Sequence, residues 1–297
     1  MKVKTLLPAI VCALFMSLSS ANAAPAFARS LFVWDSSGIR GDQAAQSAFF
    51  RFIDAPFGHR EHAIETLFFD GVRQSGFDDG ATEESLRRFL RAAHGRGLSV
   101  YYLCGDPAWA TPAQQPRALA SLNAVIAFNA RGKRGEQYDG ITYDVEPYLV
   151  KGWPSQDLRD GYLELLQRSG TIIRASRQRF TMTAVIPRWF SNPELNGLDQ
   201  RVIDASDGIV IMDYVTTASR LVNDAGKELS HASSVNKPAW IAVETGELKE
   251  TPRATFFGQP ASAMEQVLSE ALRSFQSQTS FAGYAIHCLG SYQAMQP

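Results

Sequence analysis

The sequence predicts one α/β domain, a parallel sheet of eight strands closed into a (β/α)8 barrel. Eight short runs rich in β-branched and aromatic residues alternate with helical patterns along the chain. Most of these runs end in an acidic residue or a tyrosine, whereas a buried parallel strand is normally apolar throughout. No glycine-rich phosphate loop follows the first run, which disfavours the second choice, an open doubly wound sheet.

The eight strands are expected in runs that combine apolar and β-branched residues. They are Leu31–Asp35, Glu65–Asp70, Leu98–Cys104, Gly140–Glu146, Phe180–Ile186, Gly208–Tyr214, Ala239–Glu244 and Gly283–Cys288. The fourth and sixth runs both open with Asp-Gly-Ile, at Asp139 and Asp207. Glycine is ordinary at the loop that leads into such a strand, so the repeat indicates βα units and not function.

The helices are expected between the strands, where apolar residues recur every three to four positions. The clear patterns are Glu83–Ala93, Gln115–Ala130, Gln156–Arg177 and Ala263–Gln276. Two weaker helices are expected at Gln43–Ile53 and Ala218–Ser233, and the segment after Phe190 is expected to be irregular.

The N-terminus has the pattern of a secretory signal peptide. Lys2 and Lys4 precede an apolar stretch at residues 6–18, and Ala21-Asn-Ala23 provides a small-residue cleavage site. We therefore expect a signal peptide at 1–23, a barrel domain at 24–297, and export to the periplasm or the medium. No other segment is apolar for long enough to suggest a transmembrane helix.

Charge and cysteine usage narrow the classes of partner. Loss of Lys2 and Lys4 would leave 27 basic against 30 acidic residues, without the basic patch that nucleic acids or anionic membranes attract. Cys104 and Cys288 would remain, on strands three and eight with opposite facing, so a disulfide between them is not expected. No cysteine spacing suggests zinc. We expect a monomer that binds neither nucleic acid nor a cofactor.

In barrels of this type, functional side chains project from the carboxyl ends of the strands. Those ends carry Asp35, Asp70, Asp106, Asp144 with Glu146, Arg188, Tyr214, Glu244 and His287. The solvent-exposed mouth of a barrel is polar whatever the function, so several of these residues, considered one at a time, would have a structural role only. Glu146 and Glu244 favour function, because carboxylates on central strand ends are costly unless they are used or paired.

The fourth run places two carboxylates on one face. Side chains alternate along a strand, so Thr142, Asp144 and Glu146 point one way. Two neighbouring carboxylates repel, which predicts a raised pKa for one of them, as a general acid requires.

Aromatic residues accompany the same strand ends. They are Trp34, Trp109, Tyr148, Trp153, Trp189 and Tyr292. Each alone could cap the core, but as a set they favour an acidic, aromatic cleft on which sugar rings stack.

The run Asp139-Gly-Ile-Thr-Tyr-Asp-Val-Glu146 resembles the fourth-strand signature of chitinase-like family 18 glycoside hydrolases, Asp-Gly-x-Asp-x-Asp-x-Glu. Met212-Asp-Tyr214 is similar to that family's Met-x-Tyr on strand six. The resemblance implies that Glu146 is the general acid, that Asp144 orients an N-acetyl group and that Tyr214 helps to hold it. Thr142 replaces the middle aspartate, and His287 stands where the family usually has tryptophan.

A second motif, Ala242-Val-Glu-Thr-Gly246, resembles the seventh-strand nucleophile motif of clan A glycosidases. That resemblance implies Glu146 as acid/base and Glu244 as nucleophile in a double displacement, with Tyr214 bonded to the nucleophile. Val145 stands where that clan usually has asparagine. The same three residues therefore serve either mechanism.

Together these observations predict an exported glycoside hydrolase that acts on an oligosaccharide or a polymer. The expected catalytic residues are Glu146, Asp144, Glu244 and Tyr214. The expected substrate-binding residues are Trp34, Asp35, Asp106, Trp109, Tyr148, Arg188 and His287. Two alternatives stay open: a non-catalytic, lectin-like carbohydrate-binding barrel, and a metal-dependent hydrolase that uses Asp35, Asp70 and Asp106.

Overall fold

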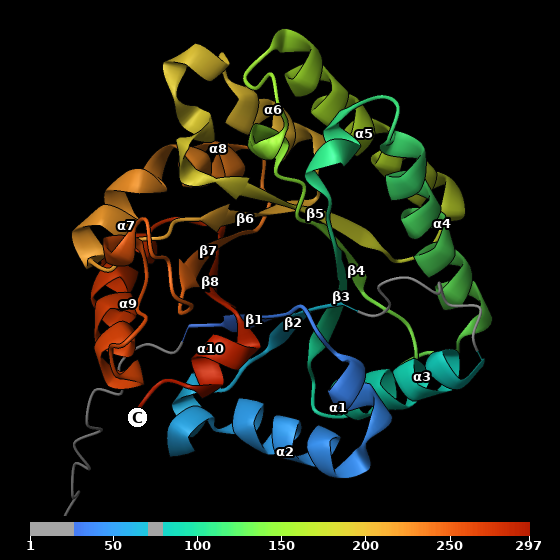
Figure 1. Cartoon of the computed structure of the whole chain (residues 1–297), viewed down its shortest axis with the longest axis vertical. Coiled ribbons are helices and arrows are strands. Elements are labelled where there is room, and N and C mark those ends of the chain that lie inside the picture. The colour runs from blue at the N-terminus through green and yellow to red at the C-terminus, as the bar shows by residue number, and fades with distance from the viewer. Residues whose placement is uncertain (1–26, 71–79) are drawn as a thin grey trace, which may run out of the picture.

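The chain folds as a closed barrel of eight parallel strands surrounded by helices, as the sequence predicted (Figure 1). The structure, a computed structural model, describes residues 27–70 and 80–297. The predicted signal peptide lies outside these residues. The strands are β1 (Arg29–Val33), β2 (Thr66–Phe69), β3 (Ser99–Cys104), β4 (Gly140–Tyr143), β5 (Thr181–Pro187), β6 (Gly208–Met212), β7 (Ala239–Glu244) and β8 (Phe281–His287).

The helices lie outside the strands and form the outer wall seen in Figure 1. The α-helices are α1 (Ser37–Gly41), α2 (Gln43–Asp54), α3 (Gly80–His94), α4 (Gln115–Arg131), α5 (Gln156–Ser176), α6 (Leu198–Ala205), α7 (Ala218–Asp224), α8 (Gly226–Ser234), α9 (Ala261–Phe275) and α10 (Leu289–Gln293). Short 3-10 turns are η1 (Pro56–Gly58), η2 (Arg60–His62), η3 (Pro107–Ala110), η4 (Pro147–Leu149), η5 (Arg188–Ser191), η6 (Pro193–Leu195) and η7 (Pro252–Ala254).

Two expectations about helices were wrong. The weak helix expected at Ala218–Ser233 is two helices, α7 and α8, because the first ends at Asp224 and the second begins at Gly226. The segment after Phe190 is not irregular throughout, since it contains the eight-residue helix α6. Asn196 and Gly197 adopt left-handed backbone conformations just before α6, which separates it from the preceding turn η6.

The strands close the barrel because β1 pairs in parallel with both β2 and β8. Along each strand, side chains alternate between two apolar layers. In β1, Phe32 belongs to the inner layer inside the barrel, whereas Leu31 and Val33 belong to the outer layer between strands and helices. The same alternation places Cys104 against the outer layer and Cys288 against the inner one, and both cysteines are free, as expected.

The repeated Asp-Gly-Ile has a structural explanation. Asp139 accepts a hydrogen bond from the backbone N–H of Val100 (2.7 Å), and Asp207 accepts one from Met182 (2.8 Å). Each aspartate therefore ties the start of its own strand to the strand before it. A Cβ at Gly140 would lie 2.5 Å from the carbonyl oxygen of Thr181, so this position has no room for a side chain.

Several strand ends are shorter than predicted. β4 ends at Tyr143 and β6 at Met212, whereas the predictions extended to Glu146 and Tyr214. The chain nevertheless continues beside its neighbours, because Asp144 N donates to Cys104 O (2.9 Å) and Asp213 N donates to Ala242 O (3.1 Å). The residues just past the strands therefore stay at the carboxyl end of the barrel, where all eight parallel strands terminate.

Candidate active site

Asp144 and Glu146 lie just past the end of β4, on the inner side of the barrel. Thr142 below them is fully buried, and the intervening Tyr143 and Val145 pack in the outer layer. The tip of β3 comes very close, since a Cβ at Gly105 would lie 1.8 Å from the carbonyl oxygen of Asp144. Glycine at this position therefore lets the neighbouring chain approach and hold Asp144 at the mouth.

The environment of this pair raises the pKa of both carboxyl groups. Burial, and secondarily the negative charge of Glu146, raises the pKa of Asp144 to about 7. Burial also raises the pKa of Glu146, and a hydrogen bond with the Tyr148 hydroxyl opposes that rise. The Oδ1 atom of Asp144 is shut off from solvent and has no hydrogen-bond partner. The pair is therefore suited to hold a proton near neutral pH.

Tyr214 connects the fourth-strand pair to the seventh strand. Burial raises the pKa of Tyr214 well above its usual value, and the negative charges of Asp144, Glu244 and Glu146 add to the effect. Tyr214 is thus close to all three carboxylates and keeps its proton. The structure brings the four residues expected to be catalytic together at one mouth, with the phenol as a hydrogen-bond donor.

Glu244, at the end of β7, has both carboxylate oxygens occupied. Its Oε1 accepts hydrogen bonds from the backbone N–H groups of Thr245 (2.9 Å) and Gly246 (2.6 Å). Its Oε2 lies 2.7 Å from Nδ1 of His287, at the end of β8. The other ring nitrogen of His287, Nε2, accepts a hydrogen bond from the indole Nε1 of Trp34 (3.0 Å). Trp34, His287 and Glu244 therefore form a continuous hydrogen-bonded chain, called here the Trp–His–Glu chain.

The remaining residues expected to bind substrate are spread over different environments. Arg188 pairs with Asp224 and lies 3.8 Å from Asp213, so other acids occupy its guanidinium. Asp35 is exposed and accepts hydrogen bonds from Ser37, and Asp106 caps η3 by accepting from Ala108 N.

Trp109 differs most from the expected placement. It is 8% exposed and packs in the outer layer, edge-on to Tyr143 at 6.1 Å between ring centroids. Tyr292, also expected to flank the mouth, is fully buried in the outer layer against Phe52 and Phe57. The positions of both rings support the core-capping alternative, because neither is on the inner side of the barrel.

Three of the expected aromatics do lie together on the loops after β4 and β5. Tyr148 meets Trp189 edge-on at 5.0 Å, and Trp189 meets Trp153 at 6.2 Å. All three rings are partly exposed, and Leu149 beside them is 62% exposed. We call Tyr148, Trp153 and Trp189 the aromatic wall. It adjoins the acidic pair, because the Tyr148 hydroxyl is close enough to Glu146 to lower the pKa of that carboxyl group.

Sequence reasoning missed two features of this site. The backbone N–H groups of Thr245 and Gly246 hold Glu244, and only the glycine in the seventh-strand motif hinted at a tight turn there. The bond between Trp34 and His287 joins residues 253 positions apart in the sequence, and no local pattern signals it.

The described residues contain no group of three or more histidine, cysteine, aspartate or glutamate side chains placed to hold a metal ion. Asp35, Asp70 and Asp106 thus form no such cluster, and the metal-dependent alternative gains no support from the geometry. Within the same residues, no helix is both long and apolar enough to cross a membrane.

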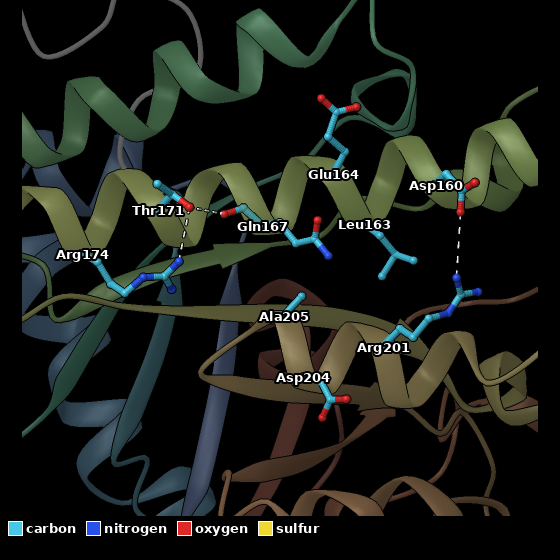
Figure 2. Close-up of a pocket in the computed structure, with 9 residues that line it drawn as sticks. All are labelled: Asp160, Leu163, Glu164, Gln167, Thr171, Arg174, Arg201, Asp204 and Ala205. Atoms are coloured by element: carbon cyan, nitrogen blue, oxygen red, sulfur yellow. Dashed lines mark hydrogen bonds and ion pairs between the residues drawn. The ribbon is translucent and has the colours of Figure 1, made fainter.

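A groove of about 670 Å³ lies away from the mouth, between α5 and α6 on the outside of the barrel (Figure 2). Arg174 bonds to Thr171 at one end, and Arg201 faces Asp160 at the other, with Leu163 between them. None of its lining residues belongs to the acidic pair, the aromatic wall or the Trp–His–Glu chain.

Comparison with known proteins finds a likeness in fold and no match in sequence. No family model and no curated protein matches the sequence. Among solved structures, a chitinase from Chromobacterium violaceum has a TM-score of 0.55 at 14% identity, over 91% of this chain and 97% of its own. A GH18 chitinase from Pseudoalteromonas aurantia has a TM-score of 0.57 at 10% identity, over 89% and 94%. A Cellulomonas fimi endo-β-1,4-mannanase has a TM-score of 0.53 at 13% identity, over 89% and 66%. At these identities the likeness is one of fold.

Proposed function

We propose that this protein is a glycoside hydrolase in which Glu146 is the general acid and Asp144 is its partner. The observation that carries the proposal is the acidic pair, two inward carboxyl groups whose pKa values are both raised. Similarity in fold to two chitinases and a mannanase is consistent with a carbohydrate substrate.

The chemistry follows from the arrangement of the pair. A raised pKa increases the protonated fraction of Glu146, and its carboxyl group can then give a proton to the glycosidic oxygen as the bond breaks. Asp144 shares the buried environment, and a proton held on it reduces the repulsion when Glu146 becomes ionised. Tyr214 donates a hydrogen bond to whichever group gains negative charge at the reacting centre.

The aromatic wall supports a sugar as the ligand. Tyr148 lies beside Glu146, and the partly exposed rings of Trp189 and Trp153 extend from it. Flat apolar faces of this kind suit the C–H faces of sugar rings. Trp34 and His287, which follow from β1 and β8, lie at the same mouth and are bonded to each other.

The contacts of Glu244 favour the chitinase-like arrangement over the pairing of strands four and seven. A nucleophilic carboxylate needs an oxygen that is open to the sugar, whereas both oxygens of Glu244 accept bonds from protein groups. In the chitinase-like arrangement the second carboxylate orients a substrate group and does not itself attack the sugar, so it needs no open oxygen. Asp144, beside Glu146 and with an oxygen that has no hydrogen-bond partner, is assigned that role.

The test is turnover of β-1,4-linked oligomers of N-acetylglucosamine, mannose and glucose by wild-type and variant proteins. Glu146→Gln removes the proton donor and keeps its shape, so turnover should fall by roughly 10²–10⁴-fold while binding survives. Asp144→Asn should also be severe. Glu164→Gln, on the exposed side of α5, is the matched control and should leave turnover unchanged.

Wild-type protein that binds these oligomers but cleaves none would contradict the hydrolase and favour a non-catalytic carbohydrate-binding barrel. Full turnover by Glu146→Gln would contradict the assignment of the acid.

A further inference from the structure

The Trp–His–Glu chain defines where the protons on His287 lie. An indole nitrogen is a donor only, so Nε2 of His287, 3.0 Å from Trp34 Nε1, must be the acceptor of that bond. A neutral imidazole carries its proton on one nitrogen, which leaves the proton on Nδ1. That nitrogen then donates to Oε2 of Glu244, at 2.7 Å. The bonds are consistent with the neutral ring protonated at Nδ1 and with no other form of it.

The contacts of Glu244 fix its Oε2 atom as the acceptor of the hydrogen bond from Nδ1 of His287. Two backbone N–H groups, from Thr245 and Gly246, bond to its Oε1 and leave Oε2 for the histidine. The Glu244 side chain is 6% exposed, so solvent offers little competition for its oxygens. The carboxylate therefore serves as a fixed hydrogen-bond acceptor for Nδ1 of His287.

We propose that Glu244 is a positioning residue: together with Trp34 it holds His287 as the Nδ1–H tautomer, so that Nε2 is a hydrogen-bond acceptor in the barrel mouth. The ring is set among inner-layer aromatics, 5.4 Å from Phe32 and 6.1 Å from Tyr214 between centroids. Nε2 has a single lone pair, which Trp34 occupies. A ligand can bond to this atom only through a donor group, such as a sugar hydroxyl, that takes the place of the indole N–H. This last step rests on the proposed function, whereas the tautomer does not.

A single substitution should reverse the tautomer. In Glu244→Gln, the backbone donors of Thr245 and Gly246 still require an oxygen, so the amide oxygen should occupy the Oε1 position. The amide NH2 group then faces Nδ1 of His287 and can only donate to it. The histidine proton should move to Nε2, where it would oppose the indole N–H of Trp34 and break that bond.

The experiment is ¹⁵N NMR of the imidazole groups in the uniformly labelled full chain, in which protonated and unprotonated ring nitrogens are well separated. The chain has five histidines, and His287→Gln identifies the signals of interest. Wild-type protein should show a protonated Nδ1 and an unprotonated Nε2, and Glu244→Gln should exchange the two. The matched control is Asp204→Asn, which alters another histidine–carboxylate pair, at His231, and should leave the His287 signals in place.

A wild-type His287 protonated at Nε2 or at both nitrogens would overturn the proposal, and this result needs no variant to fold. An unchanged tautomer in a folded Glu244→Gln would overturn it as well. A third readout separates positioning from nucleophilic catalysis: restored turnover of Glu244→Ala in added azide would mean that Glu244 is a nucleophile. If no oligomer is cleaved by any form, the proposed function fails, while the NMR result still decides the role of Glu244.

Discussion

Tyr148 shows how a single side chain at the mouth combines two tasks. Its ring belongs to the aromatic wall, and its hydroxyl interacts with the carboxyl group of Glu146, two residues earlier, and lowers its pKa. That interaction stabilises the ionised carboxylate and so works against burial, which favours the protonated form. Position in the barrel thus sets the general direction of the pKa of Glu146, and one neighbour adjusts it.

Tyr148→Phe should therefore raise the pKa of Glu146. A general acid is active while protonated and loses activity as pH rises through its pKa, so the alkaline limb of the kcat/KM profile should move to higher pH. The profile of the variant on an oligosaccharide substrate checks this. Tyr292→Phe, which alters a buried tyrosine whose hydroxyl has no partner, is the control and should leave the limb in place. A limb displaced to lower pH would contradict the assignment of Glu146.

At the scale of elements, polar pairs join strands to helices away from the mouth. Arg29 in β1 forms two hydrogen bonds with Glu265 in α9, at 3.2 and 2.6 Å, and both side chains are almost fully buried. Asp213, just past β6, is also fully buried, yet neither of its oxygens has a hydrogen-bond partner. The Arg29–Glu265 pair satisfies both of its charges, whereas the environment of Asp213 favours a protonated carboxyl group.

Glu265→Leu should destabilise the fold by about 3–5 kcal/mol, because it leaves Arg29 buried without its partner. The double variant Arg29→Met/Glu265→Leu should be more stable than Glu265→Leu alone, since no unpaired charge remains. Urea denaturation of both variants measures the difference. If the double variant is the less stable of the two, the backbone contacts of Arg29 with Phe27 and Glu61 outweigh the charge effect.

Asp213 should make stability depend on pH. Burial, and secondarily the charge of Asp224, raises its pKa to about 8, whereas an unfolded aspartate has a pKa near ~3.9. The folded state then binds more protons than the unfolded state between these values, so this group lowers stability as pH rises from about 4 to 8.

Asp213→Asn removes that dependence. Its melting temperature should exceed that of wild type by a margin that grows across this pH range, with each 1 kcal/mol worth roughly 2–4 °C. Asp54→Asn, which removes an exposed partner of Arg96, is the control and should change little at any pH. A margin that shrinks as pH rises would show that Asp213 is ionised in the folded state.

At the scale of the whole molecule, closure of the barrel is what assembles the mouth. The Trp–His–Glu chain uses β1, β7 and β8, and the acidic pair follows β4, so the site spans both ends of the sequence. The junction of β1 with β8 brings Trp34 to His287.

Export is a proposal about the whole chain that the N-terminal sequence supports. Lys2, Lys4, the apolar stretch and Ala21-Asn-Ala23 predict cleavage after Ala23. N-terminal sequencing of protein recovered from the periplasm or the medium should begin at Ala24. An uncleaved product retained in the cytoplasm would refute the signal peptide.

Much of the fold could be predicted from the sequence, because strand and helix periodicities are local properties. The alternation of eight runs predicted the closed barrel, and the two-residue period predicted that Asp144 and Glu146 share one face. Element ends were less accurate, as in β4 and in the split between α7 and α8. The end of a helix or strand depends on where its backbone hydrogen-bond partners end, and not only on the residues of the segment itself.

The sequence by itself determined the barrel, the common face of the two carboxylates after strand four and the presence of an acid at the end of strand seven. Only the tertiary structure decided what each polar group contacts. Arg188 lies beside Asp213, just past β6, and Asp224 in α7. Trp109 packs in the outer layer, and Glu244 accepts hydrogen bonds from His287 and two backbone groups. The physical reason is that strand periodicity fixes the direction of a side chain, whereas its partners come from residues far along the chain that meet only when the barrel closes.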